Sequence, residues 1–552
     1  MTLNDVTMLF KFIGGLGMFL YGMHIMAGGL QKAAGGKLKK LMTFLTKNRL
    51  VAVLVGTGIT AIIQSSSATT VMVVGFVNAG ILELTQAVGV IMGANIGTTV
   101  TAWLVSLSEF GSILKPEFYA PLLVGIGAFV MLFSKNERKK KISEIFIGIG
   151  ILFIGLSFMS GAIKTYQDSA VFRDAFAILG KNPILAIGAG LIVTAIIQSS
   201  SASVGILQTL ALNGVVNWRL AIFITLGQNI GTCVTALLSG AGAGKNAKRA
   251  SVIHLLFNII GAIIFGVVMY ILFMFNSKWA FSKINSFEIS IFHTIFNITC
   301  TIIMFPFANG LVKLSKLFIR DEREEEAKID TFADQVRRNL DSRLLNNPAF
   351  AMEAVKKEID YMGQFVIENM KQSLEAVETG SRKKIHAVVE AEKNIDFLDK
   401  ELTKFLVDVD NLSLTEHQHL LVKNMFYCIS DLERIGDHCE NISELAETMV
   451  KEDIVFSKKG TADLNEIQTA TVETVQTALD ARRTGNKKTA YRVEELEQRV
   501  DKLEDELREK HINRLSKGKC TAENGVVFLD IINNLERISD HANNIAGYVI
   551  VE

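Results

Sequence analysis

The first 312 residues alternate between long apolar segments and short polar loops. Apolar runs of about 20 residues, the length a helix needs to cross a hydrocarbon core of about 30 Å, cover 8–30, 118–134, 143–165, 251–275 and 289–312. Two longer apolar stretches cover about 50–104 and 184–238. Each is too long for one span and too short for three. We therefore predict that each stretch forms a re-entrant helical hairpin followed by one full span.

The charge of the loops predicts the orientation of these spans. Lys and Arg are frequent in four loops, 32–49, 135–141, 245–249 and 313–320. They are scarce or balanced by acids in three others, 105–117, 166–182 and 276–288. Loops rich in Lys and Arg face the cytoplasm by the positive-inside rule. If each long stretch makes one net crossing, every loop satisfies that rule. We therefore expect a multi-pass protein of the cytoplasmic (inner) membrane, with its N-terminus outside and its C-terminal part in the cytoplasm.

Two segments of this apolar region are related in sequence. Residues 47–104 and 181–238 align without gaps at an offset of 134, with 24 of 58 positions identical. Weaker similarity joins 15–26 to 148–159. Because the first long stretch starts from the cytoplasmic side and the second from outside, the repeats, about 8–134 and 143–275, are predicted to be inverted. Inverted repeats are common in transporters, with the substrate site at the mid-membrane interface of the copies.

A cluster of four polar residues stands in the middle of each long apolar stretch. The clusters are Gln64, Ser65, Ser66 and Ser67, and Gln198, Ser199, Ser200 and Ser201. Unsatisfied polar groups in lipid cost roughly several kcal/mol, so we expect these side chains to face protein or a water-lined cavity. A hairpin tip would free backbone N–H groups at a helix N-terminus, which suits an anion. The Gln and Ser oxygens equally suit a small cation. Close helix packing is the simpler role of Ser, but two identical nine-residue copies disfavour it.

A second repeated motif adds neutral oxygen ligands. It places Asn95 and Thr98 in the first copy and Asn229 and Thr232 in the second, with a glycine inside each motif that permits local unwinding. Neutral oxygens without a fixed carboxylate suit Na⁺. Nothing in the apolar segments resembles an Asp/Glu/His proton relay, so a sodium-coupled anion carrier is favoured.

Histidine and asparagine recur four residues apart in the last apolar runs, as His254 with Asn258 and His293 with Asn297. Each pair lies on one helix face. We expect these pairs to form hydrogen bonds between spans rather than to contact a ligand directly.

The paired polar motifs resemble those of the type II sodium–phosphate cotransporter family over about 8–312. The resemblance implies Na⁺-coupled transport of inorganic phosphate, with phosphate held by 64–67 and 198–201. It implies sodium ligands at Gln64, Ser66, Asn95, Thr98, Gln198, Ser200, Asn229 and Thr232. The copies differ where Ala94 is replaced by Gln228 and Thr99 by Cys233, so the two halves are not expected to bind identically.

The charged part of the chain has the apolar spacing of a helical bundle and its own repeat. We expect a linker over 319–334. Beyond it, the sequence of 431–442 recurs at 534–545, and the acidic pattern of 390–396 recurs at 495–501. We therefore predict two three-helix units within 335–552.

Acidic pairs within this second repeat are candidate metal ligands. They are Glu433 with Asp437 and Glu536 with Asp540, each pair followed directly by a histidine. Like charges four residues apart weaken a helix slightly unless a cation joins them, and carboxylates beside histidine suit Fe, Mn, Zn or Mg. This region resembles the PhoU family, which implies metal clusters on the paired motifs and modulation of phosphate uptake or signalling.

The chain as a whole is predicted to be an all-α transporter. Its transmembrane domain covers 1–318 and contains the two repeats and an extra helix over 289–312. A cytoplasmic PhoU-like domain follows over 335–552. No nucleophile–base pair or P-loop indicates an enzyme, and a net charge of +1 gives no sign of nucleic-acid binding. The expected partners are inorganic phosphate, the bilayer, a second copy of the chain and phosphate-signalling proteins. A phosphate exporter, or a membrane-anchored phosphate sensor with little flux, remains an alternative.

Overall fold

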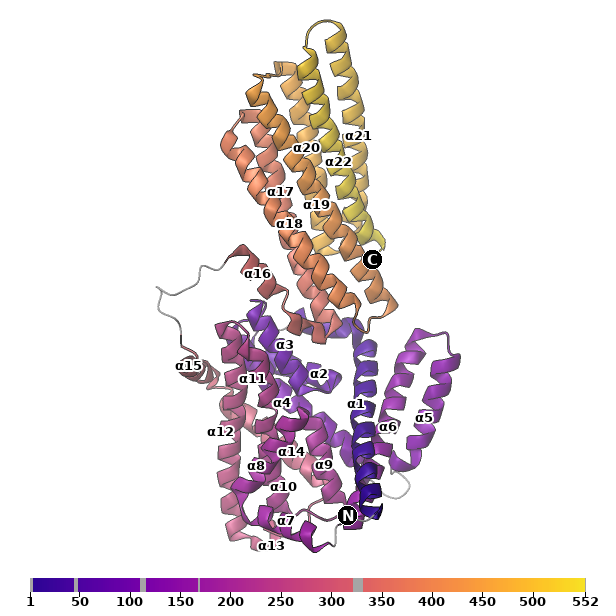
Figure 1. The fold of residues 1–552 in the computed structure, drawn as a ribbon, viewed down its shortest axis with the longest axis vertical. Coiled ribbons are helices and arrows are strands. Elements are labelled where there is room, and N and C mark those ends of the chain that lie inside the picture. Colours follow the sequence, from indigo (N-terminus) through magenta and orange to yellow (C-terminus); the bar gives the residue numbers. More distant parts are fainter. Residues whose placement is uncertain (1–2, 44–47, 110–115, 167–168, 321–330, 552) are drawn as a thin grey trace. The chain divides into compact units, whose positions relative to one another are not determined.

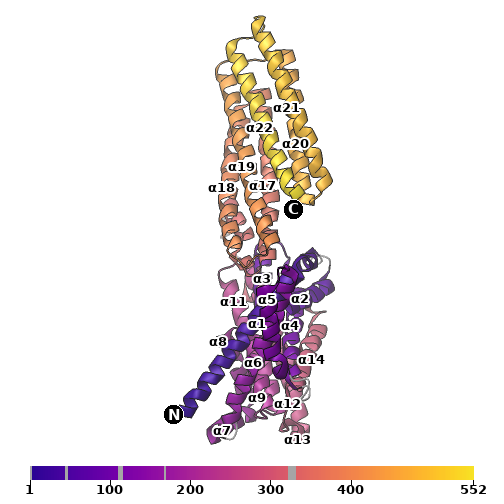
Figure 2. The same cartoon turned by 90° about the vertical axis from the view of Figure 1, so that its right-hand side faces the viewer.

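The computed structural model describes residues 3–43, 48–109, 116–166, 169–320 and 331–551. The chain divides into two compact units, Met1–Ala327 and Lys328–Glu552 (Figures 1 and 2). All elements named below are helices. Six helices in the described part of the first unit are long and apolar enough to cross a membrane, or seven if one bent pair counts as a span. The protein is therefore a polytopic helical membrane protein.

The first unit contains two copies of one arrangement of helices. The first copy comprises α1 (Leu3–Thr43), α2 (Arg49–Ile63), α3 (Ser66–Asn78), α4 (Leu84–Ser106) and α5 (Pro116–Phe133). The second comprises α6 (Glu137–Tyr166), α8 (Pro183–Ile197), α9 (Ser200–Leu212), α10 (Trp218–Gly231), α11 (Cys233–Ala241) and α12 (Lys245–Phe275). Each long apolar stretch is divided into two short helices, α2 and α3 or α8 and α9, called hairpins below, and is followed by a longer segment, α4 or α10–α11. That these hairpins are re-entrant in the membrane stays a prediction.

Several helical boundaries differ from the expectation. The helix expected over 289–312 is divided into α14 (Ser286–Met304) and α15 (Ala308–Phe318), because Pro306 lacks an N–H donor and its ring clashes with the carbonyl four residues before it. Helix α1 continues to Thr43, inside the expected loop 32–49. The amphipathic helix α7 (Ala170–Lys181), bent by 113° from α8 within the pair counted as one span, was not predicted. The expected linker lies largely outside the described residues, and α16 (Phe332–Asn339) begins within its last part.

Glycines bring the hairpin helices into contact with the spans that follow them. A Cβ at Gly93 of α4 would lie 2.0 Å from the Val53 carbonyl oxygen of α2, and one at Gly227 of α10 would lie 1.9 Å from the Ile187 oxygen of α8. Gly93 and Gly227 are equivalent positions of the repeat. Small residues let helix backbones approach closely in membranes. Both copies therefore pack by the same backbone contact.

The first helices of the two copies pack against each other as an antiparallel pair. A Cβ at Gly155 of α6 would lie 2.5 Å from the Gly15 oxygen of α1, and one at Gly148 would lie 2.7 Å from the Gly22 oxygen. Gly148 is the repeat equivalent of Gly15, and Gly155 is that of Gly22. Exchanging the copies thus turns each contact into the other, which is the behaviour of an approximate two-fold axis crossing both helices.

The second unit is a bundle of long helices (Figure 1). These are α17 (Pro348–Thr379), α18 (Arg382–Asp410), α19 (Glu416–Lys451), α20 (Lys458–Thr484), α21 (Lys487–Ser516) and α22 (Ala522–Val551). Helices α17–α19 pack on one another, as do α20–α22, and α19 joins α22. The expected pair of three-helix units corresponds to these two groups.

The glycine contact of α8 and α10 leads to a stability prediction. Replacing Gly190, whose Cβ would lie 2.1 Å from the Ile224 oxygen, by Val forces two backbones apart, whereas Gly188 of the same helix has no atom within 4 Å. Overpacking a tight contact costs typically about 1–3 kcal/mol or more. We expect Gly190→Val to lower the thermal unfolding temperature in detergent by several degrees, and Gly188→Val to leave it nearly unchanged. Equal unfolding temperatures for the two variants would contradict the close packing.

Candidate transport site and acidic clusters

Each Gln-Ser-Ser-Ser motif forms a break between two helices. Gln64 ends α2 in the left-handed region, with φ 57° and ψ 25°, and Gln198 ends α8 with φ 54° and ψ 25°. This conformation is uncommon for residues other than glycine, and its occurrence twice at equivalent positions marks a functional constraint. Ser65 and Ser199 then cap the next helices by accepting hydrogen bonds from the N–H groups of residues three positions on, at 3.1 and 3.2 Å.

A pair of buried hydroxyls joins the two arms of each hairpin. Thr60 donates a hydrogen bond of 3.0 Å to Thr69, and Thr194 donates one of 2.8 Å to Ser203. All four side chains are buried. The break is therefore fixed by side chains of the same hairpin, which holds the N-terminus of α3 or α9 in place.

The N-termini of α3 and α9 meet at their first residues. The hydroxyl oxygens of Ser66 and Ser200, which are equivalent in the repeat, lie 3.3 Å apart and are buried. A residue pair made of equivalent positions lies on the axis that relates the copies. Each helix N-terminus carries about half a positive charge and free N–H donors, so two of them together form a site for an anion.

Thr101 of α4 connects this centre to both copies. Its hydroxyl donates to Oε1 of Gln64 at 2.9 Å and accepts from Ser201 at 3.4 Å. Nε2 of Gln64 donates to the Ala61 carbonyl at 2.5 Å. The prediction from sequence did not single out Thr101, although it recurs as Thr235 within the second repeated motif. The structure thus brings Gln64, Ser66, Ser200 and Ser201 together, while the side chain of Gln198 is exposed.

The Asn and Thr side chains of the second motif are buried and donate only to their own helices. Thr98 and Thr232 donate to carbonyls four residues back at 3.0 and 2.9 Å, and the amides of Asn95 and Asn229 do the same at 3.4 and 2.9 Å. Because both threonine hydroxyls and one N–H of each asparagine amide are used as donors within the helix, the side-chain oxygens are left as acceptors. That arrangement fits a cation with oxygen ligands, as expected for Na⁺.

Gln208 of α9, which the sequence did not single out, ties the centre to neighbouring helices. Its side-chain amide donates to the carbonyls of Ala102 and Ser286, at 3.0 and 3.2 Å, and to the hydroxyl of Ser290 at 3.0 Å. Helices α4, α9 and α14 are therefore held together beside the serines.

The two His–Asn pairs make mostly local bonds. Asn258 and Asn297 donate to the carbonyls of His254 and His293 on the same helix, at 2.9 and 2.8 Å. Of the expected bonds between helices, the described residues show Asn258 with the Cys233 sulfur of α11, at 3.3 Å. Both ring nitrogens of His254 are buried without a partner in the described part.

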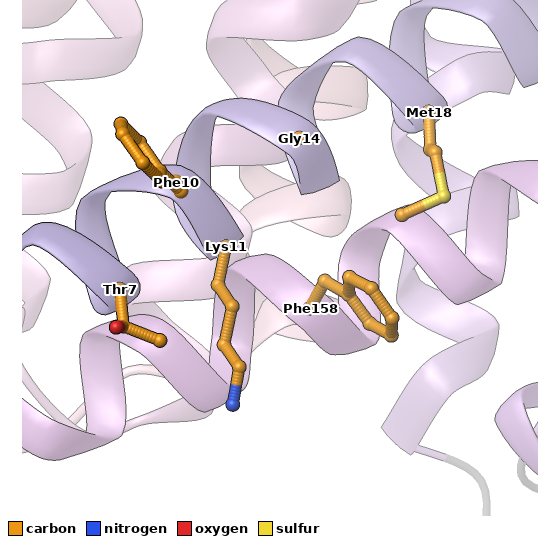
Figure 3. Close-up of a pocket in the computed structure, with 6 residues that line it drawn as sticks. All are labelled: Thr7, Phe10, Lys11, Gly14, Met18 and Phe158. Carbon is orange, nitrogen blue, oxygen red and sulfur yellow. The ribbon is translucent and has the colours of Figure 1, made fainter. Parts of the chain in front are cut away.

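A groove between α1 and α6 lies apart from these motifs. It has a volume of about 450 Å³ and is lined by Thr7, Phe10, Lys11, Gly14, Met18 and Phe158 (Figure 3). Phe10 and Phe158 are exposed, as expected of a surface that faces lipid. None of the predicted site residues lines it.

The expected acidic pairs of the second unit are joined by arginines. Arg434 lies 3.7 Å from Glu433 and 3.3 Å from Asp437, and Arg537 lies 3.5 Å from Glu536 and 3.6 Å from Asp540. The cation that relieves the repulsion between each pair is thus partly supplied by the motif itself.

A tighter carboxylate group forms between α21 and α22. Ligand oxygens of Glu497, Asp501 and Asp540 all lie within 4.8 Å of one another, and Oδ1 of Asp501 is buried without a hydrogen-bond partner in the described part. Burial, and then repulsion by Asp501 and Asp540, raises the pKa of Glu497. The donor set and the unpartnered oxygen fit a hard divalent cation. Of these residues, the sequence had predicted Asp540.

In the first three-helix unit, the residue equivalent to Glu497 is Glu392. Its Oε2 is buried without a hydrogen-bond partner in the described part. A Cβ at Gly436 would lie 2.6 Å from that oxygen, so the glycine leaves room for the carboxylate. Burial, followed by repulsion from Asp437 and other acids, raises the pKa of Glu392 to about 8.

The histidines that follow the acidic pairs face each other across α19 and α22. Nδ1 of His541 lies 2.8 Å from an oxygen of Asp431, and Nδ1 of His438 lies 2.8 Å from the oxygen of Asn534. Their rings are 5.7 Å apart. Asp431 and Asn534 are equivalent positions, so this contact also has approximate two-fold symmetry. These Nδ1 atoms therefore form contacts between the two three-helix units, and they do not point to the group of Glu497, Asp501 and Asp540.

Together these features define a membrane transporter whose apolar helical unit holds two opposed helix N-termini and whose second unit is an acidic helical bundle. The chain belongs to the Na⁺/Pi-cotransporter family, whose model matches residues 18–161 and 163–297. The PhoU domain model matches 359–446 and 464–549. The expected resemblances are therefore confirmed, and the chain is a phosphate transporter rather than an enzyme.

Individual relatives cover different parts of the chain. A candidate inorganic phosphate export protein, YjbB of Salmonella typhimurium, is 24% identical over 98% of this chain and 97% of its own length. The sodium-dependent phosphate transport protein 2A of Rattus norvegicus is 35% identical over 18% of this chain and 16% of its own length. The crystal structure of PhoU from Pseudomonas aeruginosa matches at 23% identity and a TM-score of 0.35, over 36% of this chain and 94% of that one.

The raised pKa of Glu392 leads to a pH prediction. The folded protein holds this proton more tightly than the unfolded chain, where the pKa is the usual 4.5. The free energy of unfolding of the second unit therefore falls by about a few kcal/mol as the pH rises from about 4.5 to about 8. It is measured with a chelator present. Glu392→Gln should remove most of this fall.

Urea unfolding of the full chain, followed by pulse labelling of the buried Cys439 thiol at one fixed pH, measures the effect. Glu390→Gln, which changes an exposed carboxylate of the same helix, is the control and should keep the pH dependence of the parent. A parent midpoint that does not change between pH 5 and pH 8.5 would show that Glu392 is not protonated in the folded state.

Proposed function

We propose that this protein carries inorganic phosphate together with Na⁺ across the cytoplasmic membrane. The observation that carries the proposal is the meeting of the α3 and α9 N-termini at Ser66 and Ser200. Phosphate is a multivalent anion, and freed N–H groups, serine hydroxyls and two helix dipoles are the donors it requires. In this assignment Gln64–Ser67 and Gln198–Ser201 line the phosphate site.

Sodium would occupy the adjacent oxygens. The side-chain oxygens of Gln64, Ser66, Asn95 and Thr98, and of Gln198, Ser200, Asn229 and Thr232, are neutral. A cation beside the anion lowers the electrostatic cost of holding either one at membrane depth. The name of the rat relative, a sodium-dependent phosphate transport protein, agrees with this coupling.

Alternating access would follow from inverted repeats. The axis inferred from Gly15, Gly22, Gly148 and Gly155 crosses antiparallel helices; if those helices run across the membrane, this axis lies in the membrane plane. The basic loops then place the N-terminus outside and the second unit in the cytoplasm. Association into a homodimer and contact with phosphate-signalling proteins stay predictions.

Phosphate export is the second candidate. The Salmonella relative, which matches nearly the whole of both chains, is named as a candidate export protein. Site geometry is the same for either direction, because a carrier runs down the combined gradient of its substrates. Deleting the gene separates the two: cell phosphate should rise if the protein exports and fall if it imports.

The transport proposal predicts Na⁺-dependent flux that requires the two serines. Radiolabelled phosphate uptake by proteoliposomes should need a Na⁺ gradient, and Ser66→Ala or Ser200→Ala should lower the uptake rate at least about tenfold, corresponding to about 1.4 kcal/mol. Ser143→Ala, which removes a buried hydroxyl bonded only to its own helix at 2.7 Å, is the matched control. An equal rate of phosphate uptake by sealed vesicles without a Na⁺ gradient would contradict the proposed coupling to Na⁺.

For the second unit, we propose a regulatory role with a divalent metal held by Glu497, Asp501 and Asp540. A bound Fe, Mn, Zn or Mg ion would neutralise three carboxylates whose repulsion the arginine only partly offsets. The equivalent residues of the first three-helix unit, Glu392, Asp396 and Asp437, form with Glu433 and Glu536 the rest of the acidic surface available to a metal cluster.

The metal proposal predicts binding that depends on Asp501. Purified full-length protein, loaded with Mn²⁺ and desalted, should retain metal by elemental analysis, and Asp501→Asn should lose more than half of the amount bound at that unit. Glu495→Gln, which alters a nearby exposed carboxylate, should retain metal like the parent. Identical metal content in all three proteins would place the metal elsewhere.

A further inference from the structure

The two copies of the transport site differ in one bridge. In the first copy, Thr101 joins Gln64, which ends α2, to Ser201, which begins α9 in the other copy. The equivalent residues are Thr235, Gln198 and Ser67. Among the described residues this second bridge is not made, because Oγ1 of Thr235 is buried with no partner.

The surroundings of the two hairpins differ in the same sense. Gln64 is buried, whereas Gln198 is exposed. Helix α2 buries seven residues, but α8 buries only Ala186, Gly190 and Thr194. Both hairpins pack closely on their own spans, but the tip of the first hairpin is buried and the tip of the second is exposed at Gln198.

The helices that carry Thr235 and Thr101 occupy equivalent places in the two copies. Thr101 lies in α4, and Thr235 lies in α11, which continues α10 past the helical residue Thr232 within one apolar span, Trp218–Ala241. Helix α11 packs against α3, which begins beside Ser67, just as α4 packs against α9. The partners of the unmade bridge are therefore on neighbouring helices.

We propose that Thr101 and Thr235 act as alternating latches of the transport cycle, where a latch is closed when the threonine hydroxyl bridges the Gln of its own hairpin and a Ser of the other. In the state seen here the Thr101 latch is closed, and the Thr235 latch is open. Exchanging the roles of the two copies gives the opposite state, in which Thr235 bridges Gln198 and Ser67 while Thr101 is released. The inference rests on the proposed carrier function and assigns positioning residues to it.

The exchange explains how the two states could have similar free energies. A buried hydroxyl without a partner destabilises the state that contains it. Here that hydroxyl belongs to Thr235, and in the opposite state it would belong to Thr101. Because each state makes one bridge and leaves one hydroxyl unpaired, neither is strongly favoured, and substrate binding can shift the population.

Isosteric substitutions test the latches through conformation as well as flux. Thr101→Val removes the closed latch and should shift the population toward the opposite state about fivefold or more. Amide hydrogen exchange of the full-length protein in lipid nanodiscs should then speed up over 60–70 and slow down over 194–204. Thr235→Val should keep the parent exchange pattern, because it removes only the latch that is already open.

Both valine variants should lower net phosphate uptake at least about fivefold, because each removes one of the two states that the cycle needs. Thr101→Ser and Thr235→Ser keep a hydroxyl and should restore uptake. Thr225→Val, which removes a buried hydroxyl bonded only to Ala221 of its own helix at 2.8 Å, is the control and should match the parent. Thr101→Ala and Thr235→Ala replace the valine variants if those do not fold.

Parent-like uptake by both Thr101→Val and Thr235→Val, or an exchange pattern in Thr101→Val that does not reverse, would overturn the latches. If the parent protein itself shows no phosphate flux, the proposed carrier function fails instead. The two failures are therefore distinguishable within one set of measurements.

Discussion

The structure of the first unit depends on two helix N-termini that face each other inside an apolar protein. Their partial positive charges repel and their first N–H groups lack intrahelical partners. Ser65 and Ser199 each accept a hydrogen bond from one of these N–H groups, and the hydroxyls of Ser66 and Ser200 lie 3.3 Å apart where the helices meet. Under the proposed carrier function, an anion bound there would reduce the repulsion between the two helix ends.

Glycine contacts make that opposition geometrically reproducible. Because α2 crosses α4, and α8 crosses α10, at backbone distance, each hairpin is fixed against its own span before it meets the other copy. The crossing of α1 and α6 then sets one copy against the other. A Cβ at Gly93 or Gly227 would lie 2.0 or 1.9 Å from a carbonyl oxygen, so a side chain there would force the helices apart, which ties the position of the site to small residues outside it.

Local patterns in the sequence predicted much of this arrangement, but contacts between distant segments were not accessible to them. The length of the apolar stretches and the polar motifs placed the breaks at Gln64 and Gln198, because each stretch was too long for one span and its polar cluster had to face protein or water. Pro306 carried a signal for the division of α14 and α15 that the apolar run obscured. Thr101, Gln208 and the arginines beside the acidic pairs gained their roles from partners on other helices or from side-chain geometry. The cluster of Glu497 and Asp501 with Asp540 likewise joins two helices, and the pairing along one helix had pointed to Glu536 instead.

Both units use duplication in the same way. Each contains a contact between equivalent residues near its axis, Ser66 with Ser200 in one and His438 with His541 in the other. Each also departs from symmetry away from that contact. In the first unit the departure is conformational, since Thr101 and Thr235 are identical but only one is bridged. In the second it is chemical, since Asp431, which contacts His541, is replaced by Asn534, which contacts His438, and only the aspartate side can form an ion pair. A conformational difference between identical residues can reverse, whereas a difference in sequence cannot. The first unit is therefore suited to alternate between two states, and the second to keep one arrangement of its helices.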